Sequence, residues 1–104
     1  MSSPYVRCRE TLAPAGNTLG VKVTVDDALT EGARLRDALD LIARHLDHDI
    51  ALCSHGDVLG SLMIHYAAHG IPVHGDRVEK ASIWVLQVED ADVRKATYVS
   101  PPDL

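Results

Sequence analysis

Three stretches of the chain have the hydrophobic pattern of β-strands. Residues 21–25 alternate strictly between valine and polar side chains, which is typical of a half-buried strand. Residues 50–54 open with a short apolar run of the kind found in a buried parallel strand. Residues 82–88 form a further strand, and 93–99 follow after a turn at 89–92, so this end of the chain predicts a β-hairpin.

Two further stretches have helical spacing. In residues 33–46 apolar side chains recur every three or four positions, with charged side chains between them, which predicts an amphipathic helix. A second helix is predicted over 57–69, with Asp57 as its N-cap and with Gly70 and Pro72 ending it.

The start of the chain predicts a shorter helix. Residues 1–4 are too few to form an element, and Pro4 suits the first turn of a helix. The following residues, 6–12, read as a short helix that ends around Pro14 and Gly16.

Alternating helices and strands predict an α/β fold. The order favours a three-layer domain built on a mostly parallel sheet, with a C-terminal antiparallel hairpin at its edge. The chain has 104 residues, which suits one domain over 1–104, closed by Pro101 and Pro102. No strand precedes the first helix, so few strands are left for the helices to cover.

Composition and charge exclude several classes of protein. The net charge is −5 without a basic cluster, which argues against nucleic acid as a partner. No apolar run approaches the roughly 20 residues of a membrane-spanning helix, so no membrane association is expected. Two cysteines are too few for a disulfide framework, and a cytoplasmic location fits best.

The turn at residues 54–56 is the strongest candidate for a functional site. A strand that turns directly into a helix brings its turn to the carboxyl edge of a sheet, where free N–H groups at the helix start favour an anion. His55 lies in this turn and can donate a hydrogen bond to a phosphate or a carboxylate. The alternative is that His55 only caps the helix.

Two more residues could serve such a site. Arg7 lies near the start of a predicted helix, and a guanidinium can bind a phosphate through two hydrogen bonds. Glu31 follows the strand at 21–25 and could act as a general acid. Taken singly, a residue of either kind is usually a solvated surface charge.

Other patterns point to no further chemistry. His65, His69 and His74 are spaced as metal ligands can be, but no glutamate of a zinc-protease motif or nearby thiolate accompanies them, so no metal is expected. Neither Cys8 nor Cys53 is followed six positions later by arginine, which excludes a cysteine phosphatase. No cofactor is expected.

Three segments in order resemble the histidine phosphatase superfamily, the phosphoglycerate-mutase-like fold. They are residues 2–11 (SSPYVRCRET), 27–32 (DALTEG) and 54–58 (SHGDV). The resemblance implies that Arg7 and His55 bind the phosphoryl group of a small phosphorylated molecule. It also implies that Glu31 protonates the leaving oxygen.

The family's first strand, which ends in an Arg-His-Gly motif with the nucleophilic histidine, has no counterpart here. The resemblance therefore implies an N-terminally incomplete domain without its first strand, a phosphomonoester hydrolase that is poorly active or inactive as given. A non-catalytic phosphate- or nucleotide-binding or interaction module is the alternative, and a misfolding gene remnant is a third. An exposed sheet edge would favour a homo-oligomer.

Overall fold

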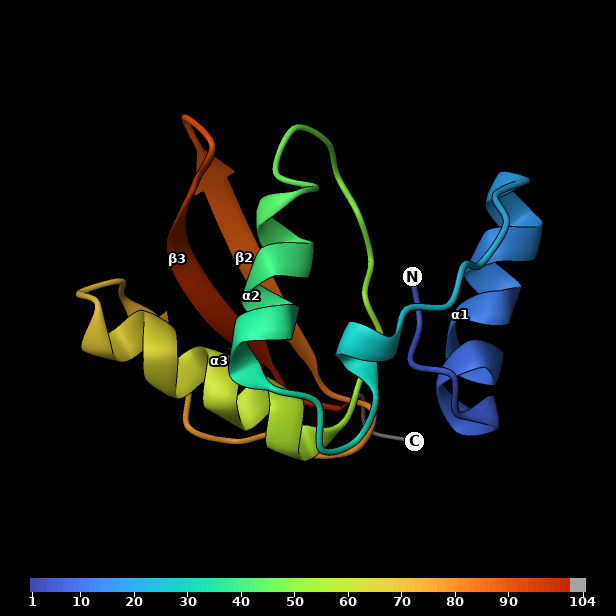
Figure 1. Ribbon diagram of the computed structural model, residues 1–104, viewed down its shortest axis with the longest axis horizontal. Helices are drawn as coiled ribbons and strands as arrows, with labels where there is room; N and C mark the ends of the chain where they lie inside the picture. The colour runs from blue at the N-terminus through green and yellow to red at the C-terminus, as the bar shows by residue number, and fades with distance from the viewer. Residues whose placement is uncertain (102–104) are drawn as a thin grey trace.

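The computed structural model describes residues 1–101, so Pro102, expected to close the domain, lies outside the described part. This part of the chain forms an α/β domain with three α-helices, one 3₁₀ turn and a three-stranded mixed sheet (Figure 1). In chain order the elements are α1 (Val6–Leu19), η1 (Asp27–Leu29), α2 (Leu35–Ala43), α3 (Gly56–Ala68), β1 (Val73–His74), β2 (Ile83–Glu89) and β3 (Asp92–Val99).

The sheet has the order β1-β3-β2, and its two pairings run in opposite senses. β2 and β3 form the predicted antiparallel hairpin, with Leu86 opposite Ala96. Its turn places Asp90 and Ala91 at φ 53° and 61°, the left-handed conformation that a tight two-residue hairpin turn needs. β1 pairs with β3 in parallel over two residues, so His74, expected in a loop, ends a short strand. The sheet is mixed rather than mostly parallel.

Helices α2 and α3 pack on one face of this sheet and enclose the main hydrophobic core (Figure 1). Ala96 is fully buried on β3, where its small side chain lets the helices approach the strand. The buried members of this cluster, called the core below, are Ala38, Ile42, Val58, Leu62, Met63, Tyr66 and Ala96.

A second set of extended segments lies at the start of the chain. Residue 2 bridges in parallel to Val25 on one side and to Cys53 on the other. The N–H of Ser2 donates to the carbonyl of Thr24 at 2.8 Å, and the N–H of Ser3 donates to that of Cys53 at 2.9 Å. Residues 1–3, 24–26 and 51–53 are called the N-terminal ladder below.

This ladder corrects the prediction of full strands at 21–25 and 50–54. Each expected strand is reduced to a single bridge, because the segment between them contributes only residues 1–3 to the ladder. Val21 instead donates its N–H to the carbonyl of Gly16, at 2.9 Å. Residues 1–4, expected to form no element, supply the central segment.

Helix α1 is longer than expected, because neither Pro14 nor Gly16 ends it. Pro14 lies inside the helix, and Tyr5 is its N-cap, so Pro4, expected in the first turn, precedes the helix. Gly16 has a different role, since a Cβ there would lie 2.8 Å from the carbonyl oxygen of Val21. The helix ends at Gly20, whose φ of 67° is left-handed.

Helix α2 is shorter than the predicted 33–46, because the chain leaves the helix after Ala43 and continues in turns. Helix α3 matches the predicted 57–69 closely, but its N-cap is His55 rather than Asp57. Within residues 1–101, no helix has the length and apolarity needed to cross a membrane.

Candidate functional site

His55 lies at the start of α3 and is the most buried member of the candidate site, with 8% of its surface exposed. Its Nε2 atom is 2.8 Å from the Oγ of Ser3, a fully buried residue of the N-terminal ladder. The imidazole therefore joins the ladder to the first turn of α3. No side chain caps this turn, so its free N–H groups add the positive end of a 13-residue helix to the site.

Arg7 comes from the first turn of α1 and connects the other two predicted residues. Its Nη2 atom is 3.2 Å from the Nδ1 of His55 and 3.3 Å from Oε2 of Glu31. The side chains of Arg7 and Glu31 are 66% and 53% exposed, so solvent reaches this end of the site. The structure thus brings Arg7, Glu31 and His55, which are far apart in sequence, into one cluster.

These contacts fix the tautomer of His55. A guanidinium has only donors, so Nδ1 must accept the hydrogen bond from Arg7. The neutral ring then carries its proton on Nε2 and donates it to Ser3. Nδ1 is the ring nitrogen that contacts the exposed side chain of Arg7.

The same tautomer decides against Ser3 as a nucleophile. A serine nucleophile needs Nε2 as the base that accepts its proton. In this cluster Nε2 is the donor, and the Oγ of Ser3 also receives the backbone N–H of Tyr5 at 3.3 Å. Ser3 therefore holds the imidazole in place and is not activated.

The loop that carries Glu31 is tied to α3 by Asp57. The N–H of Gly32 donates to Oδ2 of Asp57 at 2.7 Å, and Gly32 has a φ of 80° that favours glycine. A second link runs from the Oγ of Ser54 to the carbonyl of Leu29, at 2.7 Å. Asp57, predicted as a helix cap, instead positions the loop.

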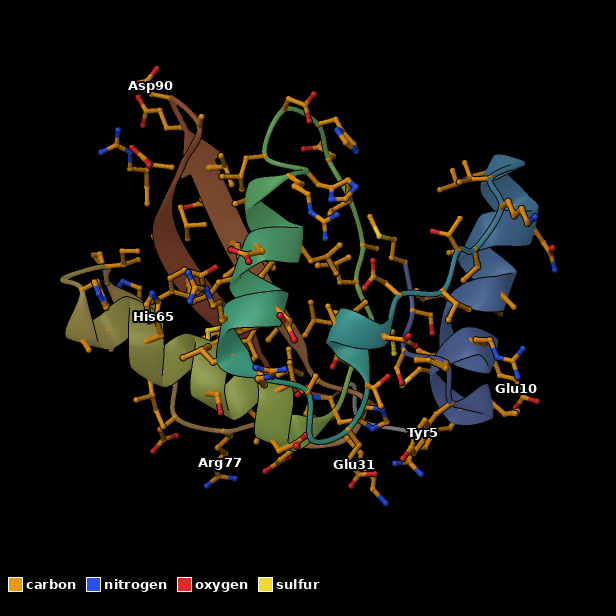
Figure 2. The ribbon with its side chains drawn as sticks, in the orientation of Figure 1. Tyr5, Glu10, Glu31, His65, Arg77 and Asp90 are labelled. Atoms are coloured by element: carbon orange, nitrogen blue, oxygen red, sulfur yellow. The ribbon has the colours of Figure 1, made fainter. Side chains whose placement is uncertain are left out.

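Sequence reasoning missed two residues that contact the cluster. The ring of Tyr5 lies edge-to-face with that of His55, with centroids 4.8 Å apart, and the Cζ of Arg7 is 5.0 Å from the Tyr5 centroid. The Sγ of Cys8 is 3.8 Å from the Nε2 of His55. Both belong to the segment that contains Arg7, but the spacing alone does not show which of its side chains turn inward. In Figure 2 Tyr5 and Glu31 lie along the same lower edge of the molecule.

The two cysteines are free, and Cys53 is a poor nucleophile. Burial, together with a hydrogen bond with the Cys8 thiol, raises the pKa of the Cys53 thiol to about 11. Because the thiolate is the reactive form, little of Cys53 is reactive near neutral pH.

Other clusters in the described residues do not offer an anion site or a metal site. A surface hollow of about 670 Å³ is lined by four aspartates, two alanines and one arginine, so its carboxylates outnumber its single cation and disfavour an anion; the charged members are Asp26, Asp27, Asp37, Asp40 and Arg44. His65 and His69 stack on α3 with centroids 4.1 Å apart, and across residues 1–101 no three histidine, cysteine or acidic residues gather as metal ligands would.

The cluster contains side chains of the kind that bind oxyanions. An anion beside Nη2 of Arg7 and Nδ1 of His55 would receive charge-assisted hydrogen bonds from both once Nδ1 takes up a proton. Glu31 contacts the same Nη2 atom of Arg7 and could supply a proton to an oxygen bound there.

In comparisons with protein-family models and with curated proteins, no match to this chain is found.

Proposed function

We propose that this chain binds the phosphoryl group of a small phosphomonoester between Arg7 and His55, as a histidine-phosphatase-like domain would. The observation that supports the proposal best is the shared contact of Nη2 of Arg7 with His55 and Glu31. A guanidinium, an imidazole protonated on Nδ1 and an uncapped helix N-terminus each favour a dianion. Glu31 would protonate the departing oxygen of the ester.

The contacts of His55 favour binding over turnover. In the described part of the chain its side chain meets Ser3, Tyr5, Arg7 and Cys8. Ser3 is held as an acceptor, and Cys8 is 4% exposed, which leaves no activated nucleophile among these four. We therefore expect phosphoester hydrolysis by this chain to be slow or absent. A non-catalytic phosphate- or nucleotide-binding module is the second candidate, favoured by this same observation.

Calorimetric titration with inorganic phosphate tests the proposal. Wild-type protein should bind, and Arg7→Ala and His55→Gln should each lower the affinity about tenfold or more, because each removes a charge-assisted hydrogen bond. Arg36→Ala is the matched control, since Arg36 is an exposed arginine of α2 and its loss changes the net charge equally. Equal losses in Arg7→Ala and Arg36→Ala would reject the site.

A hydrolysis assay with an aryl phosphate separates the two candidate functions. The binding module predicts hydrolysis at the background rate. Turnover that His55→Gln abolishes would instead show a working phosphatase. A cytoplasmic location remains a prediction, with which the two free thiols are consistent. Self-pairing through a sheet edge also remains a prediction.

A further inference from the structure

The ring of Tyr5 lies directly beside the position proposed for the phosphoryl group. It is in contact with both groups that would hold the anion: its centroid is 4.8 Å from that of His55 and 5.0 Å from the Cζ of Arg7. Tyr5 is nonetheless 39% exposed, so packing within the chain leaves part of this residue accessible to a ligand. An apolar surface of this kind is not needed to hold inorganic phosphate.

Charge and burial around the cluster indicate on which side of the phosphoryl group the apolar part of the ester would lie. Glu31 contacts Arg7 at 3.3 Å, so the carboxyl group there can meet the ester oxygen that it would protonate, but it does not suit the apolar part of the ester. The Ser3 side of His55 is fully buried, which closes that direction too. The exposed ring of Tyr5 and the exposed guanidinium of Arg7 border the remaining side.

We propose that the phosphomonoester bound at this site carries its phosphate on an aromatic ring, which packs against Tyr5 and the guanidinium of Arg7. This inference rests on the proposed function. Aromatic rings prefer offset or edge-to-face contact with other rings, and a planar guanidinium stacks on aromatic faces. A saturated ring of the same size offers neither interaction, so affinity distinguishes the two.

The test is calorimetric titration with inorganic phosphate, phenyl phosphate and cyclohexyl phosphate. The wild-type protein should bind phenyl phosphate about 3- to 10-fold more tightly than cyclohexyl phosphate, the range that one aromatic contact supplies. Tyr5→Leu, which keeps an apolar side chain, should reduce this ratio to about 1, and Tyr5→Phe should retain it.

The outcomes separate this inference from the proposed function. If inorganic phosphate binds while both esters bind equally in the wild type, the aromatic preference is wrong and the phosphate site stands. The same holds if inorganic phosphate binds and neither ester does. If none of the three anions binds, both proposals fail. A wild-type preference that persists in Tyr5→Leu would place the aromatic contact elsewhere and overturn the role of Tyr5.

Discussion

The N-terminal ladder and the core stabilise this molecule in different ways. In the core, β2 and β3 pair over most of their length, and two helices bury apolar side chains against them. In the ladder the described bridges form only at Ser2, with a few backbone hydrogen bonds beside them. The bridge partner Val25 stays 50% exposed, and Val21 in the same stretch stays 62% exposed. The core therefore depends on apolar burial, and the ladder depends on a few hydrogen bonds.

The candidate site lies where these two regions meet. Arg7 follows the ladder on α1, and His55 begins α3, a helix of the core. The hydrogen bond between Ser3 and His55 joins the two regions. The comparison thus indicates that loss of the ladder would disturb the site before it disturbs the core.

The largest expected effect comes from the core. Leu62→Ala should lower the free energy of unfolding by about 2–5 kcal/mol, because Leu62 is 3% exposed and its removal leaves a cavity. Urea unfolding followed by circular dichroism measures this. Ile64→Ala on the same helix is the control: Ile64 is 73% exposed, so its loss should change stability by about 0.5 kcal/mol or less. Similar losses in both variants would contradict the burial argument.

Breaking the link between the regions should have the next largest effect. Ser3→Ala leaves the Nε2 of His55 buried without its partner, which should lower the free energy of unfolding by about 1–3 kcal/mol. Phosphate affinity should fall as well, since the imidazole is no longer held. Ser61→Ala, at an exposed position of α3, should change neither quantity. Wild-type phosphate affinity in Ser3→Ala would show that the ladder does not support the site.

The ladder should also weaken at high pH. The Cys53 thiol has its pKa raised from 9.0 to about 11, so the unfolded chain loses this proton first. Its contribution to stability is therefore complete below pH 9 and is lost as the pH rises through 11. Urea unfolding at several pH values should show a smaller decline in Cys53→Ser than in the wild type. Burial raises the pKa of the core residue Tyr66 too. The difference in pH dependence between Tyr66→Phe and the wild type therefore measures how much of the decline in stability comes from the core.

The smallest effect on stability should come from the exposed part of the site. Arg7→Ala removes an ion pair whose side chains are 66% and 53% exposed, so it should lower the free energy of unfolding by about 1 kcal/mol or less. Thermal melting with and without phosphate provides the measurement: the melting temperature without phosphate should change little, while the rise on adding phosphate should disappear. A large loss of stability would mean that Arg7 has a structural role.

The sequence by itself determined the elements with strong local patterns. The helix near 57–69, the hairpin over 82–99 and its turn follow from periodicity and turn chemistry, and all three are present in the structure. Periodicity succeeds here because each element has a partner next to it in the chain or buries a continuous apolar face.

Only the tertiary structure decided the rest. Val21 to Val25 have a clear strand pattern, yet a strand needs a neighbour along its whole length, and the ladder offers only residues 1–3. Gly16 is of a residue type that commonly ends a helix, and Asp57 is of a type that commonly caps one. Contacts with other segments of the chain give both residues other roles. Likewise the sequence marked Arg7, Glu31 and His55 singly, whereas their meeting, the tautomer of His55 and the place of Tyr5 depend on distances across the fold. Local pattern encodes how a segment prefers to fold, and long-range packing decides which segments touch.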